Sequence, residues 1–214
     1  MVKMTIVIGI IAGYILGSIP SAYIAGRLKK GLDIREIGGG NMGALNVIRE
    51  LGWSAGVFVL VTDLSKGILS VLIARWLGLQ LLWVLAAGFA AVAGHNWPIF
   101  LKFRGGKGGA TIMGVLVALV PLEFLSGFAI TAIVVIITSN PALGMGIGLV
   151  FIPLFIWWYS GSGLLIGYSV FLALFVIIRF IFSGLKKIPE GTDSKKNLIF
   201  SREYHFWQVK KNHH

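Results

Sequence analysis

The chain lacks cysteine and carries few charges. Of its 214 residues only 13% are charged, with 8 acidic side chains against 19 lysines and arginines, whereas an average soluble domain is about one quarter charged. The missing cysteines exclude disulfides, thiolate catalysis and cysteine-based metal clusters. The shortage of charge excludes an ordinary water-soluble domain, since 57% of the residues are hydrophobic and the mean hydropathy is +0.87.

Long uncharged runs take up most of the chain. Residues 4–26 and 124–178 carry no charge, and residues 76–101 carry none apart from His95. Because about 20 apolar residues cross a bilayer, we predict an all-α integral membrane protein, a bundle of about seven transmembrane helices with two glycine-rich cytoplasmic loops. The predicted spans cover residues 4–26, 52–74, 77–97, 109–122, 124–138, 142–158 and 163–183.

We expect two parts along the chain. Residues 1–184 form the polytopic domain, and residues 185–214 form a basic cytoplasmic tail. The first apolar run has no small-residue cleavage site behind it, so it is expected to remain as a span rather than to be removed as a signal peptide.

The positive charge predicts how the chain crosses the membrane. With the N-terminus outside, the cations within 27–49, within 102–107 and beyond 185 share one side, which the positive-inside rule makes the cytoplasm. Topology therefore explains the net charge of +11, and nucleic-acid binding is not expected. As a helix, segment 124–138 rises only about 22 Å, which is less than the roughly 30 Å core of a bilayer. It could therefore join 109–122 in one broken helix. That merger would put the basic tail outside, and the charge asymmetry therefore favours seven or five spans.

Two glycine-rich basic segments interrupt the apolar runs, from Gly38 to Arg49 and from Phe103 to Thr111. Glycines let backbone N–H groups close on phosphate oxygens, and arginine or lysine neutralises them. Irregular backbone survives at membrane depth only in a wet or protein-lined site. The loops predict a site for a phosphorylated ligand. Its candidate binding residues are Gly38, Gly39, Gly40, Asn41, Gly43, Arg104, Gly105, Gly106, Gly108 and Thr111.

Neither loop is a soluble nucleotide-binding motif. The run from Gly38 to Gly43 has the Gly-x-Gly-x-x-Gly spacing of a dinucleotide site, but no strand precedes it. The second loop lacks the Lys-Ser/Thr pair of a Walker A loop. Tight helix contact is the other common use of membrane glycines. It suits Gly144, Gly146 and Gly148, but not loops whose glycines interleave with cations and asparagines.

Three more polar residues lie where lipid would be expected. Asp63 and Lys66 are three apart in the second apolar run, so they share a helix face. Intramembrane charges usually face a bundle interior, which leaves two roles open, a structural ion pair or contact with substrate. His95 ends the third run near the second loop, where it could serve packing or the site.

With these motifs the chain resembles the acyl-phosphate-dependent glycerol-3-phosphate acyltransferases of the bacterial inner membrane, the PlsY family. The family's first motif is matched by Asp-Ile-Arg at 33–35 and then from Gly38 to Arg49, and its second from Phe103 to Thr111. Further matches are the Gly-Ser-Ile-Pro-Ser-Ala-Tyr signature at 17–23, Asp-Leu-Ser-Lys-Gly at 63–67 and Gly-His-x-x-Pro at 94–98.

The chain departs from the family pattern at functional positions of the first and third motifs. In the first motif Gly39 replaces a serine and Leu45 a threonine. In the third motif Phe180 stands for a histidine and Ser183 for an asparagine. These losses leave a rival interpretation open, in which the same fold binds or transports a phosphorylated metabolite or lipid without catalysis.

The resemblance implies transfer of a fatty acyl group from acyl phosphate to the 1-hydroxyl of glycerol 3-phosphate. Lysophosphatidic acid and phosphate would form, for phospholipid biosynthesis, in the bacterial plasma membrane with the active site facing the cytoplasm. The expected partners are the two substrates and the lipid bilayer, with no metal or cofactor and no indicated oligomeric state. The candidate catalytic residues are Arg49, Lys107 and Asn46, with His95 at the substrate and Asp63, Lys66 and Ser183 behind them.

Overall fold

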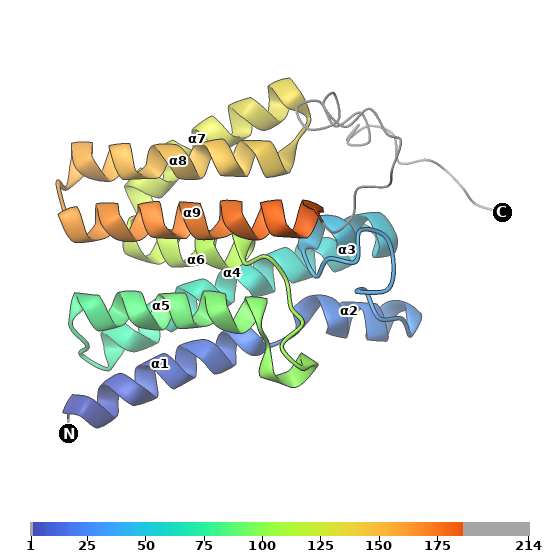
Figure 1. Cartoon of the computed structure of the whole chain (residues 1–214), viewed down its shortest axis with the longest axis horizontal. Coiled ribbons are helices and arrows are strands. Elements are labelled where there is room, and N and C mark those ends of the chain that lie inside the picture. Colours follow the sequence, from blue (N-terminus) through green and yellow to red (C-terminus); the bar gives the residue numbers. More distant parts are fainter. Residues whose placement is uncertain (1, 186–214) are drawn as a thin grey trace. The chain divides into compact units, whose positions relative to one another are not determined.

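The computed structural model describes residues 2–185, with side chains through Phe182. This part of the chain is helical and contains no strand. It divides into two compact units, with the boundary after Pro121. Figure 1 shows the helices in chain order. The first unit contains α1 (Val2–Ser18), α2 (Ser21–Lys30), α3 (Ala44–Leu51), α4 (Trp53–Trp76), α5 (Leu81–Asn96), the 3₁₀ turn η1 (Ile99–Leu101) and α6 (Gly109–Leu119).

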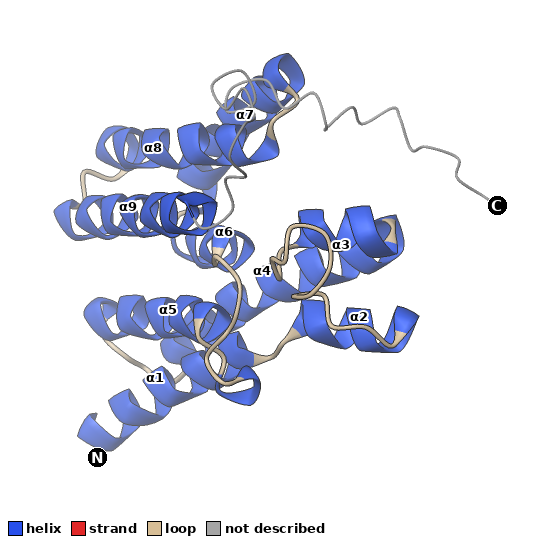
Figure 2. Cartoon of the chain, turned by 45° about the vertical axis from the view of Figure 1, so that its right-hand side comes forward, coloured by secondary structure: helices blue, strands red, loops and turns tan. Residues whose placement is uncertain are grey.

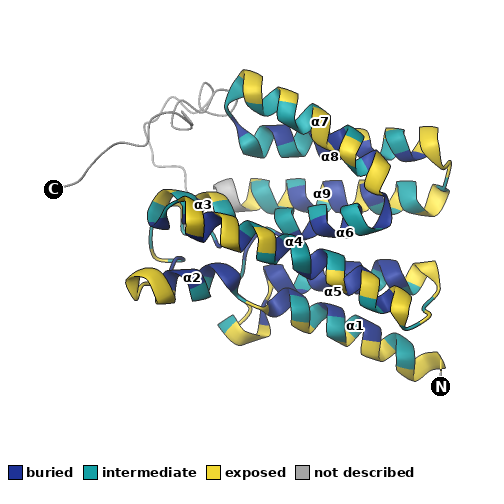
Figure 3. Cartoon of the chain, turned by 180° about the vertical axis from the view of Figure 1, so that it is seen from behind, coloured by how far each residue is buried: buried dark blue, intermediate teal, exposed yellow. Residues whose placement is uncertain are grey.

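Backbone-to-backbone helix contacts build the first unit. A Cβ at Gly13 or Gly17 of α1 would meet the backbone of α5, which lies alongside (Figure 2). In the same way, a Cβ at Gly67 of α4 would meet the backbone of α6, and a Cβ at Gly114 of α6 would meet the backbone of α4. Membrane helices associate through such small residues because lipid offers no hydrophobic driving force. The result is a tightly packed frame, in which α5 is buried along most of its length (Figure 3).

The first span is broken between α1 and α2. Pro20 lacks a backbone N–H and cannot continue the helix, so the chain turns through Ile19 and restarts at Ser21. The amide of Ser21 donates to the carbonyl of Ile19 at 3.0 Å. α2 then ends at Gly31, whose φ of 67° is left-handed. The break places Ser21 on the first turn of a new helix, pointing into the unit.

The chain reverses sharply after α5 to form the second glycine loop. Beyond η1, Lys102 and Phe103 both have left-handed backbone, with φ of 52° and 60°, an arrangement that costs about 1–3 kcal/mol for each non-glycine residue. Gly108, with φ of 86°, then caps the N-terminus of α6. The reversal brings the second glycine loop back against the end of α5.

The second unit consists of α7 (Pro121–Thr138), α8 (Pro141–Tyr159) and α9 (Gly163–Leu185). Gly144 and Gly148 of α8 face α7, where a Cβ would meet the carbonyls of Thr131 and Gly127, so the predicted small-residue contact is confirmed there. The prediction is wrong for Gly146. Nothing lies within 4 Å of a Cβ at that position, and it lines an apolar pocket of about 400 Å³ instead.

Six helices of the described chain are long and apolar enough to cross a membrane, which confirms a multi-pass membrane protein. Each of the seven predicted spans corresponds to a helical segment, and α1 and α2 together form the first one. α6 is the short member at 11 residues, a rise of about 16 Å. The predicted tail lies outside the described residues apart from Leu185.

Candidate active site

Asn46 organises the first glycine loop from inside. Its side-chain oxygen accepts from the amide of Gly39 at 2.8 Å, and its side-chain nitrogen donates to the carbonyl of Asn41 at 2.9 Å. The same nitrogen makes longer contacts of 3.4 Å to the carbonyls of Ile34 and Ile37. Asn46 is itself buried, on the first turn of α3. One side chain thus ties both ends of the loop to the helix that follows it.

The glycine amides are used differently from the sequence prediction. Gly39 donates to Asn46, and Gly40 donates to the carbonyl of Ile37 at 3.0 Å. In the second loop, Gly105 and Gly106 donate to backbone carbonyls at the end of α5, at 3.1 and 3.0 Å. These four amides hold the loops in shape, so the expectation that they point at a phosphate is not met in this structure.

Gly38, Gly43 and Gly108 have geometric roles that the sequence did not specify. Gly38 is left-handed, with φ of 55°, and a Cβ there would collide with the carboxylate of Glu50. Gly43 precedes α3, and Gly108 precedes α6. Each loop therefore leads directly into a helix N-terminus, where unpaired N–H groups and the helix dipole favour an anion.

The expected cations differ in exposure. Arg49, in the last turn of α3, is exposed, and so is Arg104, whereas Lys107 is partly buried. Thr111 is fully buried in the first turn of α6, and its hydroxyl is the one buried side-chain polar atom among the described residues that has no hydrogen-bond partner. Asn41 is partly buried and contributes its carbonyl to Asn46.

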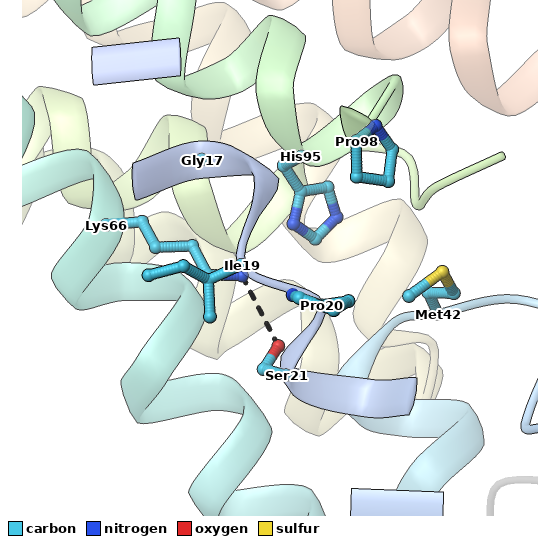
Figure 4. A pocket seen from close by; sticks show the side chains of 8 residues that line it. All are labelled: Gly17, Ile19, Pro20, Ser21, Met42, Lys66, His95 and Pro98. Atoms are coloured by element: carbon cyan, nitrogen blue, oxygen red, sulfur yellow. Dashed lines mark hydrogen bonds between the residues drawn. The ribbon is translucent and has the colours of Figure 1, made fainter. Parts of the chain in front are cut away.

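A buried polar cluster lies where α2, α4 and α5 converge. One oxygen of Asp63 accepts from Ser21 Oγ at 2.6 Å and contacts Lys66 Nζ at 2.6 Å. His95 Nδ1 lies 3.6 Å from the same oxygen. All four residues have relative exposures of 1–8%. Three of them line a pocket of about 10 Å³, shown in Figure 4, roughly the room that one water molecule needs.

Both glycine loops reach this cluster. Met42 of the first loop lines the small pocket together with His95 and Pro98 (Figure 4). In the second loop, a Cβ on Gly106 would collide with Nε2 of His95. The structure therefore brings together the two loops, His95 and the Asp63–Lys66 pair, all of which the sequence nominated separately.

A partly buried ion pair just before the first loop contacts the turn that precedes the second. Arg35 binds Asp33 at 2.6 Å, lies over the ring of Tyr23 at 5.5 Å and makes a 3.5 Å contact to the carbonyl of Leu101. The hydrogen bond from Arg35 lowers the pKa of Asp33, and the same contact raises the pKa of Arg35. Both side chains therefore stay charged across the physiological range.

Sequence reasoning missed Ser21, Asp33 and Arg35 as parts of the site. A signal existed for Ser21, because it falls in the Gly-Ser-Ile-Pro-Ser-Ala-Tyr signature and follows the one proline in the first span. The Asp-Ile-Arg stretch at 33–35 was read only as part of a motif. The side chain of Ser183, a candidate from sequence, lies outside the described residues.

The fold and the site define a multi-pass membrane protein with two cationic glycine loops gathered over a buried charge cluster. A family model described as glycerol-3-phosphate acyltransferase matches residues 7–186. The chain is 44% identical to glycerol-3-phosphate acyltransferase 1 of Dehalococcoides mccartyi, covering 89% of this chain and 94% of that one. It is 40% identical to the enzyme of the same name from Geobacter sulfurreducens, covering 85% and 93%.

Solved structures agree with the sequence relatives. The crystal structure of PlsY (YgiH), an integral membrane glycerol 3-phosphate acyltransferase, in its glycerol 3-phosphate form matches with a TM-score of 0.77 and 30% identity, over 90% of this chain and 98% of that one. Its lysophosphatidic acid form matches with a TM-score of 0.74 and 31% identity, over 81% and 87%. The chain belongs to the glycerol-3-phosphate acyltransferase family.

Proposed function

We propose that this protein transfers a fatty acyl group from acyl phosphate to the 1-hydroxyl of glycerol 3-phosphate, giving lysophosphatidic acid and phosphate. Family membership supports the reaction, as do the glycerol 3-phosphate and lysophosphatidic acid forms of the related structure. In this chain, the supporting observation is that two cationic glycine loops lie at one end of the first unit. Both reactants carry a phosphate, so each loop has a group to bind.

The chemistry needs no covalent enzyme intermediate. Acyl phosphate is an activated mixed anhydride, so the hydroxyl oxygen of glycerol 3-phosphate can attack its carbonyl carbon directly. A new ester bond forms, the bond from that carbon to the phosphate oxygen breaks, and inorganic phosphate leaves. We assign the hydroxyl proton to a phosphate oxygen of the donor. Preorganised positive charge then stabilises the developing oxyanion and the leaving phosphate.

We assign residue roles that fit the exposure and the hydrogen bonds of these side chains. Arg49 and Lys107 supply positive charge to the reacting phosphates, and exposed Arg104 adds to substrate attraction. Asn46 shapes the first loop, because its polar atoms are engaged by the loop's own backbone. Since four glycine amides are committed internally, the cations and the N-termini of α3 and α6 carry the anion binding.

We place the site at the cytoplasmic face of a bacterial plasma membrane. Arg27, Lys29 and Lys30 lie in the last turn of α2, which precedes the first loop, and Lys102 and Arg104 lie next to and within the start of the second. Concentrated cations mark the cytoplasmic side of a multi-pass protein. Acyl phosphate would then reach the site from the inner leaflet, and glycerol 3-phosphate from the cytosol.

The test uses the full chain purified in detergent and supplied with acyl phosphate and glycerol 3-phosphate. We expect lysophosphatidic acid and phosphate in equal amounts, and a loss of about 100-fold or more in kcat/KM for Lys107→Gln, the scale typical of a lost oxyanion donor. Lys102→Gln is the matched control, an exposed lysine five residues earlier, and should stay within about threefold. Absence of product from the unaltered protein would refute the proposal, and product from acyl-CoA alone would refute the donor assignment.

A further inference from the structure

The buried cluster of Ser21, Asp63, Lys66 and His95 has no assigned role in the proposed reaction. An Asp63–Lys66 pair three residues apart on one helix could satisfy itself. Instead, the same Asp63 oxygen also accepts from Ser21 on α2 and faces His95 on α5. Charged groups at membrane depth are costly and mostly functional. The extra partners point away from a self-contained ion pair and toward the loops.

The position of the Asp63 carboxylate favours hydrogen on one of the two ring nitrogens of His95. Nδ1 lies 3.6 Å from the Asp63 oxygen, within ion-pair range though longer than a hydrogen bond. A lone pair on Nδ1 would face a negative charge, so the hydrogen belongs there. In a neutral histidine, the hydrogen-bond partner of one ring nitrogen determines whether the other nitrogen carries hydrogen. The Nε2 edge is left to face the second glycine loop.

The ring of His95 in turn sets the position of that loop. A Cβ on Gly106 would collide with Nε2, so the glycine backbone lies directly against the imidazole. The amide of Gly106 donates to the carbonyl of His95 itself, at 3.0 Å, and Gly105 donates to the carbonyl of Asn96, at 3.1 Å. Rotation of the ring would therefore displace Gly106, and with it Lys107, the next residue.

We propose that Asp63 is a positioning residue for the second glycine loop, acting through the imidazole of His95. The proposal rests on the proposed function only for its kinetic consequence. A displacement of about 1 Å in a catalytic group can lower a rate by about 100-fold. Asp63 touches neither reactant in this scheme, and its effect reaches them through His95, Gly106 and Lys107.

The decisive variant is the double substitution Asp63→Leu/Lys66→Met. Replacing both members of a buried ion pair by apolar residues of similar size is often tolerated, whereas removing one member is not. A purely structural pair predicts that the double variant behaves as the unaltered protein does. A positioning role predicts the loss of function even when the protein stays folded. Thr62→Val, which alters a hydroxyl bonded within α4, is the matched control.

Two readouts are independent of activity. With ¹⁵N-labelled histidine, the nitrogen spectrum should show His95, assigned by its loss in His95→Asn, with hydrogen on Nδ1, and the double variant should lose that preference. Hydrogen exchange of peptides covering residues 103–109 should be at least tenfold faster in the double variant, with residues 34–43 unchanged. Thermal unfolding of both variants checks that they fold.

The kinetic readout completes the test. We expect kcat/KM to fall at least tenfold in Asp63→Leu/Lys66→Met and to stay within about twofold in Thr62→Val. Hydrogen on Nε2 with none on Nδ1 in the unaltered protein would overturn the proposal, and that spectrum decides it even if the double variant fails to fold. A folded double variant with unchanged exchange and unchanged kinetics would overturn it as well. If the unaltered protein forms no lysophosphatidic acid, the proposed function fails, whereas the spectrum and the exchange data still judge this inference.

Discussion

Replacement of Asn46 tests how the first glycine loop is held. The Asn46 amide makes two short hydrogen bonds, to the Gly39 amide at 2.8 Å and to the Asn41 carbonyl at 2.9 Å. Asn46→Ala removes both and leaves the two backbone groups without that partner. Because all the hydrogen-bond partners of this side chain lie within residues 34–41, the damage should be local to the loop.

The magnitude follows from those two bonds. Each contributes about 1 kcal/mol net. The loop should therefore open more easily by about 2 kcal/mol, which corresponds to roughly 30-fold faster exchange of the amides that open with it. Asn46→Asp keeps the acceptor for Gly39 but sets a carboxylate oxygen against the Asn41 carbonyl, so Gly39 should exchange more slowly than in Asn46→Ala.

Hydrogen exchange measured by mass spectrometry on peptides covering 34–43 is the assay, with peptides from α5 as the internal reference. Acyl transfer measured on the same samples should show a raised KM for the substrate that the first loop binds. The reasoning would be refuted if Asn46→Ala left exchange in 34–43 unchanged, or if exchange rose equally throughout the first unit.

Three further predictions concern the loops and the helix contacts. Gly39→Ser should fold, because φ there is not left-handed and the nearest atom to a Cβ, Asn46 Oδ1 at 3.3 Å, has to yield by only a few tenths of an ångström. The added hydroxyl should lower the KM for the reactant that the first loop binds, measured in steady-state assays. Asp33→Asn should weaken the first loop at neutral pH. In the unaltered protein the lowered pKa of Asp33 means that this stabilisation is complete above about pH 4 and is lost as the pH falls through the folded-state pKa; thermal unfolding against pH should show the acid loss in the unaltered protein and not in Asp33→Asn. Gly67→Ala should abolish folding or lower the melting temperature by about 5 °C or more, because its Cβ meets facing backbone, whereas Gly146→Ala, with open space around it, should change it little.

The sequence predicted the helical membrane fold and the two loops because those features are written in local composition. Uncharged runs of sufficient length can only be spans, and glycines mixed with cations have few structural uses in a bilayer. Asp63 and Lys66 were also visible, since charge in such a run is conspicuous. Their convergence with His95 required the packing of three helices, which no spacing along the chain encodes.

The errors have a common physical origin. From the sequence, the amides of Gly39 and Gly106 were expected to bind phosphate. In the structure the Gly39 amide donates to Asn46, and the Gly106 amide donates to a carbonyl at the end of α5. These hydrogen bonds depend on the tertiary structure. Gly146 has the same local pattern as Gly144, yet the two residues are not on the same side of α8, and only Gly144 meets α7. Composition predicts that a residue is small or polar, and tertiary contacts decide what that property is used for.

The glycine contacts of α1 with α5 and of α4 with α6 limit how this enzyme family member can change. Where the helix backbones are in contact, there is no side chain whose size a substitution could change. The packing of neither helix pair can therefore adjust to a different substrate. Any adjustment of specificity has to come from the loops and the open ends of the helices. These two helix pairs are therefore expected to stay rigid. Laboratory evolution of acyl-chain or acceptor preference should accumulate its substitutions outside the contacting faces of α1, α5, α4 and α6.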